Sequence, residues 1–386
     1  MAADGAPPRR RWRAAILVVI GVLAVAAVAG WLGYRNLSGN IATIDPTGGL
    51  GDVRPAKENQ SLNILAIGSD TREGENSAVG GESPGLADTT LVVHLAADNS
   101  WAAAVSIPRD SMVEMPDCVA ADGSVVPGAL RQFNAAFPIG GPVCVQRTVE
   151  SLTDLRIDHF VVIDFVGFKD MVDAVGGVTV YVEEPISDPR SKIYFDPGCQ
   201  VLDGDKALDY VRVRHGVGAG DGSDLGRIER QQAFLSSMAQ KVTSTGVLFN
   251  PVDLYQFLDA ATRSITTDVG LGSVRALASV AVRVRGIGLE NVDFLTVPNE
   301  AWPVDPNRVI WSQPEADELW AHLRDDAPLR PAQPVASASA PLESASAGAA
   351  SPQGSSGSAS PSGSTSPSPT TNFDTGSADR PICPTQ

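Results

Sequence analysis

The order of hydrophobic and polar positions predicts a domain in which strands and helices alternate. Residues 62–68 form a nearly continuous apolar run, which is typical of a strand buried on both faces. Two further strand-like runs, 89–95 and 101–107, are separated by the turn residues Asp98 and Asn99. We therefore expect these two runs to form a hairpin.

The alternation continues as far as residue 323. Strands are expected at 160–165, 178–182 and 292–297, and helices at 142–152, 166–175, 251–262, 273–284 and 314–323. Helices between strands, together with one hairpin, predict an α/β fold: a three-layer α/β/α domain with a mixed central sheet. We place this domain at residues 61–327, after a polar linker at residues 35–60 that contains glycine and proline.

Residues 210–214 combine a strand-like pattern with positive charge. They alternate with period two, so we expect a half-buried strand on which Tyr210, Arg212 and Arg214 share one face. A loop of glycine, aspartate and serine follows. Two arginines on one face are either surface charges paired with nearby acids or part of a site for an anion.

A helix is expected after this loop, from Leu225, with Asp224 or Ser223 as its N-cap. Arg227 and Gln231 are spaced i, i+4 and fall in the sector of this helix that should be buried. Burying a guanidinium without a counter-charge is costly. Together with the preceding arginines, this pattern predicts a site for a multiply charged anion.

Two carboxylates and a further arginine lie where predicted strands meet loops. Asp70 follows the first strand, Asp88 precedes the second, and Arg109 closes the third. Carboxylates beside an arginine cluster suit a hard divalent cation, such as Mg²⁺ or Mn²⁺, that bridges phosphate oxygens. The alternative is that both aspartates only cap their loops.

Other catalytic patterns fail on their context. Residues 81–85 match GxSxG, but Pro84 lacks the backbone N–H that would form half of an oxyanion hole. The sequence contains no P-loop, HExxH or dinucleotide fingerprint. We expect His94 and His159 to be core histidines, whereas His215, beside Arg214, is placed to reach the anion site.

The N-terminus predicts export. A basic segment at residues 1–13 precedes the run 14–34, which contains no charged residue. At about 1.5 Å per residue this run is long enough to span a bilayer as a helix. The positive charge keeps residues 1–13 in the cytoplasm and places the rest of the chain outside a cell membrane crossed once. A cleaved signal peptide, with a cleavage site near residues 27–29, is the alternative.

Charge and cysteine content narrow the function further. The net charge of −16 argues against nucleic acid as a partner. An exported chain can oxidise its four cysteines, and Cys118 and Cys144 are the expected pair. Cys199 and Cys383 either pair with each other or stay free.

The composition changes near residue 328. Residues 328–386 are rich in proline, serine and alanine and predict a disordered tail. Its last residues, 372–386, regain Phe373, Ile382 and Cys383, so the end of the chain has the means to dock or cross-link.

Several segments carry a resemblance to one family. They follow its order along the chain: 63–72, 87–89, 106–110, 133–137 with 140–141, 157–160, 172–178 and 202–231. On these segments the chain resembles the LytR-CpsA-Psr family, the extracytoplasmic cell-wall polymer ligases of Gram-positive bacteria, in its actinobacterial branch.

The resemblance implies transfer of a glycopolymer from a polyprenyl-pyrophosphate carrier to a muramic acid hydroxyl of peptidoglycan, forming a phosphodiester. Asp70 and Asp88 would hold the metal ion. The residues implied to bind the pyrophosphate are Arg109, Arg212, Arg214, Arg227 and Gln231, with Asp224 orienting the arginines. Asp88, Arg109, Arg212 and Arg214 would form the catalytic set.

The resemblance leaves some points open. Where the family often has lysine, this chain has Gln132, and the neighbouring Arg131 would supply the missing charge. Either Asp88 or Asp70 would act as the general base. The polyprenyl tail needs an apolar groove, for which Phe165, Phe168, Phe234 and Leu235 are candidates if they are not ordinary core residues. The alternatives to transfer are a non-enzymatic protein that binds polyprenyl phosphates or wall polymers, a cell-envelope regulator, and a pyrophosphate hydrolase.

Overall fold

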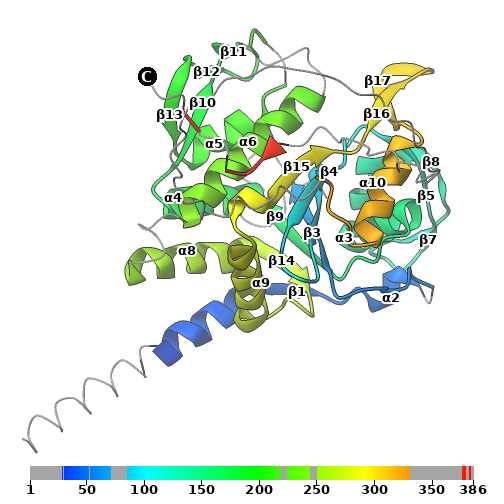
Figure 1. Ribbon diagram of the computed structural model, residues 1–386, viewed down its shortest axis with the longest axis horizontal. Coiled ribbons are helices and arrows are strands. Elements are labelled where there is room, and N and C mark those ends of the chain that lie inside the picture. The colour runs from blue at the N-terminus through cyan, green and yellow to red at the C-terminus, as the bar shows by residue number, and fades with distance from the viewer. Residues whose placement is uncertain are drawn as a thin grey trace, which may run out of the picture.

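A mixed β-sheet forms the centre of the molecule (Figure 1). The computed structural model describes residues 28, 30–51, 53–70, 85–214, 216–218, 224–243, 250–330, 376–379 and 382–383. Within these residues the sheet has eight strands in the order β1 (Ala42–Ile44), β14 (Ile265–Asp268), β9 (His159–Asp164), β2 (Leu62–Ser69), β3 (Ala87–Leu95), β4 (Ala102–Ser106), β15 (Val292–Thr296) and β18 (Gly376–Ser377). Because β2 runs antiparallel to β3 and parallel to β9, the predicted mixed sheet is confirmed.

Helices pack against both faces of this sheet. On one face, Leu65, Val92 and Val105 are paired across β2, β3 and β4 and are fully buried. They belong to one core cluster with α3 (Ala136–Thr153) and α10 (Glu315–Arg324). Burying each such side chain contributes about 1.5–3 kcal/mol. This face therefore holds the main core of the domain.

The opposite face carries five further helices, which lie on the other side of the sheet in Figure 1. They are α4 (Phe165–Ala174), α5 (Gly204–Arg212), α6 (Asp224–Thr243), α8 (Pro251–Ser264) and α9 (Val274–Ile287). Ile287 of α9 packs on Leu95 and Ala102 of the sheet. The helices α4, α5 and α6 share a second core cluster with β10 (Val178–Val182) and β13 (Gly198–Leu202).

Short antiparallel strand pairs complete the described chain. The antiparallel pairs are β10 with β13, β11 (Ile186–Asp188) with β12 (Ile193–Phe195), β16 (Asn299–Trp302) with β17 (Asp305–Trp311), β5 (Met112–Met115) with β8 (Ala129–Gln132), and β6 (Cys118–Val119) with β7 (Val125–Val126). The predicted hairpin of β3 and β4 is confirmed by their antiparallel register. The predicted helix start at Pro142 also has a structural basis, because Gly140 and Gly141 are non-helical and interrupt α3 just before it.

The predicted strand at residues 210–214 is wrong. Residues up to Arg212 belong to α5, and only Val213 and Arg214 continue without helix. The side chain of Asp203 caps α5 by accepting a hydrogen bond of 2.9 Å from the backbone N–H of Lys206. Five residues are too few to distinguish the strand period of two from the helix period of 3.6. The N-cap at Asp203, seven residues before Tyr210, indicates that the segment continues a helix.

Residues 35–60, predicted as a linker, are folded into the domain. Residues 30–40 are helical, β1 pairs in parallel with β14, and α2 covers Thr47–Leu50. Isolated apolar residues, Leu37 and Leu50, are buried there. The guanidinium of Arg54 pairs with the buried Glu150 of α3. A few well-spaced anchors thus hold a segment whose composition is polar overall.

The membrane prediction concerns residues that are largely undescribed. Only 28 and 30–34 of the span 14–34 fall within the described residues, and residues 1–13 lie outside them. Among the helices that are described, none has the length and apolar character needed to cross a membrane.

The end of the chain returns to the domain. Residues 331–375 of the predicted tail lie outside the described residues, but β18 pairs with the edge strand β15. Ala378 is buried and accepts hydrogen bonds from Ser236 and Gln240 of α6. Disulfides join Cys199 to Cys383 and, as predicted, Cys118 to Cys144. Docking and cross-linking of this end, which the sequence left open, both occur.

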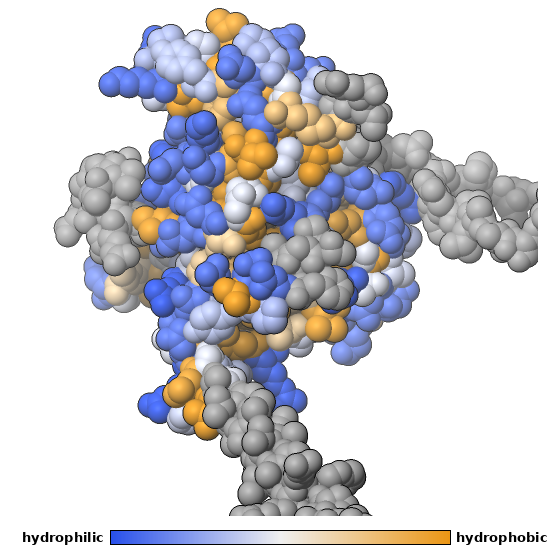
Figure 2. Space-filling model, turned by 90° about the vertical axis from the view of Figure 1, so that its left-hand side faces the viewer, coloured by the Kyte–Doolittle hydropathy of each residue, from blue (hydrophilic) through white to orange (hydrophobic). Residues whose placement is uncertain are grey.

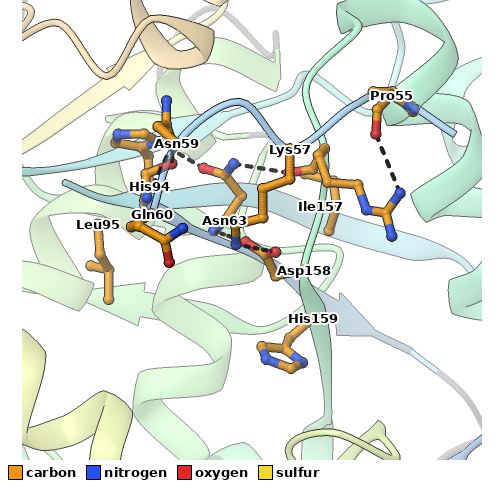
Figure 3. A network of polar contacts seen from close by, with 12 residues as sticks. Pro55, Lys57, Asn59, Gln60, Asn63, His94, Leu95, Ile157, Asp158 and His159 are labelled. Atoms are coloured by element: carbon orange, nitrogen blue, oxygen red, sulfur yellow. Dashed lines mark hydrogen bonds and ion pairs between the residues drawn. The ribbon is translucent and has the colours of Figure 1, made fainter. Parts of the chain in front are cut away.

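Both strand histidines have structural partners, but the prediction of a core histidine is confirmed for His94 alone, because His159 is only partly buried. His94 is fully buried, with its Nδ1 2.7 Å from Asn63 Oδ1 and its Nε2 3.0 Å from Asp326 Oδ1. Burial lowers the pKa of His94. Figure 3 shows how Asn63 connects this histidine to the segment before β9, since its backbone N–H donates to Asp158. His159 lies 3.0 Å from Asp268 Oδ1 through its Nδ1.

Candidate functional site

A cavity of about 580 Å³ lies between the sheet and helices α4, α5 and α6. Its sheet side is formed by β2, β3 and β9, and its helix side carries both charged and aromatic side chains. The lining residues relevant to chemistry are Asp88, Asp164, Phe165, Phe168, Asp188, Asp209, Arg212, Arg214, Arg227, Gln231, Phe234 and Leu235. Most of the residues predicted for the anion site and for the apolar groove thus surround one space.

Asp88 is held at an irregularity of the sheet. Gly68 pairs with Thr89 and Ser69 pairs with Ala87, which leaves Asp88 as the extra residue of a β-bulge. Its Oδ1 accepts a hydrogen bond from Arg109 and another, at 3.3 Å, from Nη2 of Arg214. One carboxylate therefore positions two guanidiniums that come from distant parts of the sequence.

Arg227 is the most deeply buried of the predicted arginines. It is 2% exposed, and its Nη2 donates a hydrogen bond of 3.0 Å to the backbone oxygen of Asp88. The same guanidinium pairs with Asp224, one turn earlier on α6. Burial lowers the pKa of Arg227, and the charge of Asp224 opposes that shift. The prediction that Arg227 enters the buried sector of its helix is confirmed.

Asp224 orients two arginines at once. Besides pairing with Arg227, its Oδ2 accepts the backbone N–H of Arg109 at 3.3 Å, and its Oδ1 lies 3.7 Å from Arg109 Nε. Burial raises the pKa of the Asp224 carboxyl, while Arg227 and Arg109 pull it down. The other predicted cap residue, Ser223, lies outside the described residues, as does His215.

Arg212 and Gln231 also line the cavity. The Arg212 guanidinium carbon is 4.3 Å from the centre of the Phe165 ring, so its charge rests on an aromatic face. Nε2 of Gln231 donates a hydrogen bond of 3.1 Å to the backbone oxygen of Val211, which joins α6 to α5. Arg230, the neighbour of Gln231, donates instead to the backbone oxygen of Val213.

Four predicted site residues do not line the cavity in the described part of the chain: Asp70, Arg109, Arg131 and Asp224. The Asp70 carboxylate accepts the backbone N–H of Leu86, so it caps the end of the β2–β3 pair. On β8, Gln132 donates to Asp110 at 3.1 Å, and Asp110 lies 3.6 Å from Arg109. Neighbouring residues of a strand face opposite ways, which turns Arg131 away from that contact.

The described residues contain no group of three or more histidine, cysteine, aspartate or glutamate side chains that could hold a metal ion without help. Asp70 and Asp88 flank the same end of the β2–β3 pair, because Ser69 is paired with Ala87. Mg²⁺ is commonly held by one or two carboxylates together with substrate phosphates and water. Two carboxylates at one end of a strand pair, one of them in contact with Arg109 and Arg214, fit that pattern but do not form a complete cage.

Three acidic residues that line the cavity were not predicted from the sequence: Asp164, Asp188 and Asp209. Asp164 caps α4 by accepting the backbone N–H of Gly167 at 2.8 Å. Burial raises the pKa of Asp209, and Arg212 opposes that shift. Asp209 precedes Arg212 by three residues on α5, so its place at the cavity became visible only once this segment was known to be a helix.

Apolar side chains form another part of the cavity wall. All four residues predicted for a lipid groove, Phe165, Phe168, Phe234 and Leu235, line it. The rings of Phe168 and Phe234 lie 5.3 Å apart; Phe234 belongs to the core cluster around α4, α5 and α6, and Phe168 packs against that cluster. The cavity thus combines guanidiniums with an apolar wall, and the two meet where Arg212 rests on the Phe165 ring. Such a lining suits a ligand with a charged head and an apolar tail.

Known proteins are similar to this chain in sequence and in fold. The LytR_cpsA_psr family model matches residues 37–325. LcpB of Corynebacterium glutamicum, a probable cell wall biosynthesis protein, is 33% identical over 336 residues, which cover 84% of this chain and 76% of LcpB. TagV of Bacillus subtilis, a polyisoprenyl-teichoic acid–peptidoglycan teichoic acid transferase, is 27% identical over 317 residues, covering 80% of this chain and 75% of TagV.

Solved structures agree on the architecture. The LytR-Csp2A-Psr enzyme from Actinomyces oris superimposes with a TM-score of 0.56 at 20% identity, over 74% of this chain and 96% of that one. At this identity the match concerns the fold. The family match, in contrast, extends over most of the described domain and includes the β2–β3 end, α5 and α6. The chain belongs to the LytR-CpsA-Psr family.

Proposed function

We propose that this protein transfers a glycopolymer from a polyprenyl-pyrophosphate carrier to a muramic acid hydroxyl of peptidoglycan. The observation that carries the proposal is a single cavity lined by both guanidiniums and phenylalanines. Arg212, Arg214 and Arg227 line it together with Phe165, Phe168 and Phe234. A pyrophosphate attached to a polyprenyl chain has both matching parts. Relatives named as teichoic acid transferases support the reaction class.

In this reaction the acceptor hydroxyl attacks the phosphorus that carries the glycan. The new oxygen–phosphorus bond completes the phosphodiester, and the bond to the bridging oxygen breaks. Polyprenyl phosphate leaves with that electron pair, and the hydroxyl proton passes to a base. Negative charge spreads over the phosphoryl oxygens in the transition state, so catalysis requires positioning and positive charge. Arg109, Arg212 and Arg214 would supply both, and Arg227 and Gln231 would hold the adjacent phosphate.

A divalent cation, Mg²⁺ or Mn²⁺, is part of the proposal. Asp70 and Asp88 would hold it together with pyrophosphate oxygens, and it would neutralise charge on the leaving phosphate. Asp88 already faces Arg109 and Arg214 through Oδ1, so it also acts as the residue that aligns those arginines. Asp70 brings its carboxylate to the same end of the two strands.

The proton acceptor has three candidates, Asp70, Asp88 and Asp209. The Asp88 carboxylate already accepts hydrogen bonds from Arg109 and Arg214, and the Asp70 carboxylate accepts the backbone N–H of Leu86. Asp209 lines the cavity, and burial raises its pKa. We therefore assign proton removal to Asp209.

The proposed location is the cell membrane, with residues 14–34 as a single span, residues 1–13 in the cytoplasm and the folded domain outside. A carrier lipid is itself membrane-bound, so an anchored enzyme meets its donor at the membrane surface. The alternative of a binding or regulatory protein predicts the same cavity and the same location but no bond cleavage.

The test is transfer by the full-length protein with a lipid-pyrophosphate glycan and peptidoglycan, with and without Mg²⁺. We expect Arg212→Ala combined with Arg214→Ala to abolish release of polyprenyl phosphate. The matched control is Arg275→Ala combined with Arg285→Ala, two exposed arginines of α9. Transfer that survives the first pair would refute the site. Wild-type protein that binds the lipid but never cleaves it would establish the binding alternative.

A further inference from the structure

Exposed aromatic residues from two distant segments gather at one edge of the domain. Trp31 and Tyr34, on the helical segment 30–40, are 58% and 51% exposed. Tyr255 of α8 is 41% exposed, and Val252, one turn earlier, is 61% exposed. We call Trp31, Tyr34 and Tyr255 the aromatic edge. Hydrophobic residues are visible at the lower end of the face drawn in Figure 2 and again along its middle.

The segment 30–40 is fixed along α8 by specific polar contacts. Nδ2 of Asn36 donates to Tyr255 Oη at 3.2 Å and to Asp259 Oδ1 at 2.8 Å. One turn later, Nδ2 of Asn40 donates to Asp259 at 3.0 Å and to Thr262 at 3.2 Å. These contacts are 219 to 223 residues apart in the chain, so they are tertiary contacts.

Close packing continues towards the N-terminal side of this segment. A Cβ added at Gly33 would lie 3.3 Å from the ring of Tyr255, so glycine allows the helix to approach α8 at this point. Tyr255 therefore lies at the level of residues 33–36 along the helix. The packed region overlaps the last residues of the uncharged run 14–34.

Tryptophan and tyrosine concentrate where a bilayer meets water, with their rings among the lipid headgroups. If the run 14–34 spans the membrane, Trp31 and Tyr34 mark the outer headgroup level. Arg35 directly after the run suits the same level, and its guanidinium carbon lies 5.6 Å from the Trp31 ring centre. Since Tyr255 packs beside Gly33, the first turns of α8 must lie at that level too.

We propose that the aromatic edge and Val252 form a membrane-contacting surface that seats α8 on the headgroups of an outer leaflet of phospholipid. The inference rests on the proposed membrane anchor. It goes beyond anchoring, because a flexible tether would allow any orientation, whereas the contacts of Asn36 and Asn40 with α8 fix one.

The orientation has a consequence for the cavity. Phe257 is two residues from Tyr255, about 200° around the helix, and so lies on the opposite side of α8. There it packs against the core cluster that includes Phe234 and against which Phe165 and Phe168 of the cavity wall also pack. In Figure 1 the segment 30–40, α8 and α4 follow one another in this order. Helix α8, about 10 Å across, therefore lies between the segment 30–40 and α4, the helix that carries Phe165 and Phe168 of the cavity wall.

A fluorescence experiment tests this surface in the full-length protein. The chain is reconstituted in nanodiscs of phosphatidylcholine and phosphatidylglycerol, with an environment-sensitive dye on Val252→Cys. The matched control carries the dye on Val304→Cys, which is 76% exposed in the β16–β17 turn, far from α8 in Figure 1. The described structure has no free cysteine, so labelling without reductant is directed to the new thiol.

We expect lipids with a quencher at headgroup depth to reduce the emission of the dye at 252 at least twofold and to leave the dye at 304 unchanged. Combining Asn36→Ala and Asn40→Ala should remove the quenching at 252 while the chain stays in the disc. Equal signals at 252 and 304 in a retained chain would overturn the surface alone. Extraction of the wild-type chain by alkaline carbonate would instead overturn the anchor, and the transfer assay would be unaffected by either result.

Discussion

The buried pair of Asp224 and Arg227 separates what stability requires from what the reaction requires. Asp224→Asn keeps the shape of the side chain but removes its charge. Arg227, only 2% exposed, then stays buried without its carboxylate. Removing one partner of a buried ion pair typically lowers the free energy of unfolding by about 3–5 kcal/mol. We expect a loss of that size, because Arg227 is held in its buried position by the hydrogen bond to the Asp88 backbone oxygen.

Replacing both partners should cost less than replacing one. In Asp224→Asn combined with Arg227→Met no buried charge of this pair remains, and the asparagine oxygen can still accept the backbone N–H of Arg109. The lost contact is the one from Arg227 to the Asp88 backbone oxygen, worth about 1–3 kcal/mol when the acceptor is left unpaired. The double variant should therefore be more stable than Asp224→Asn, yet it should not transfer glycopolymer.

Urea unfolding monitored by tryptophan fluorescence, with the disulfides intact, measures the difference. The wild type, both single variants and the double variant form a complete cycle. A double variant that is less stable than Asp224→Asn would refute the reasoning, because the two losses would then simply add. Transfer by the double variant at the wild-type rate would refute the assignment of Arg227 to pyrophosphate binding.

Three further predictions follow from other contacts. Burial lowers the pKa of His94 below 6.5, so the unfolded chain gains a proton first and the free energy of unfolding should fall as the pH drops below about 6.5; an unchanged pH slope in His94→Gln would contradict this. Removing the Cys199–Cys383 disulfide, whose cysteines are 184 residues apart, should lower the free energy of unfolding by about 5 kcal/mol in the chain-entropy model. Removing Cys118–Cys144, with a separation of 26 residues, should lower it by less. The reverse order of stabilities in urea would show that the chain end does not dock. Asp209→Asn should slow transfer by about 10²–10⁴ while leaving donor binding unchanged, as expected for a general base; the exposed Asp205→Asn is its control, and equal rates for the two variants would remove Asp209 from the mechanism.

The sequence predicted an element correctly where one local signal was unambiguous. The apolar run 62–68 is the central strand β2, and the helix predicted from Pro142 is the regular part of α3, which follows the non-helical Gly140 and Gly141. At residues 210–214 two periods fitted equally well, and a cap outside the stretch decided between them. The prediction that residues 35–60 are a linker was wrong for another reason. The few residues that hold this segment to the domain have partners more than 90 residues away, such as Glu150 for Arg54.

At the candidate site, too, some residues could be predicted from the sequence and others could not. Arg227 and Gln231 were predicted from the face of one helix, and that face lines the cavity. The pairing of Asp88 with Arg109 and Arg214 was not predictable, because it depends on a β-bulge and on contacts across 21 and 126 residues. Asp209 was not predicted because the residues after it were interpreted as a strand, whereas they continue helix α5. Positions along one element can be read from spacing, whereas contacts between elements need the fold.

Helix α6 contributes both a cation and an aromatic ring to the cavity. Arg227 and Phe234 line the same space. They are seven residues apart, which is about two turns and roughly 10 Å along the axis. A ligand that contacts both must therefore carry a charged group and an apolar group within about that distance of each other. A pyrophosphate bonded directly to an isoprenoid meets this condition. The spacing on α6 thus favours the lipid end of the donor as the part that occupies the cavity, with the glycan outside it.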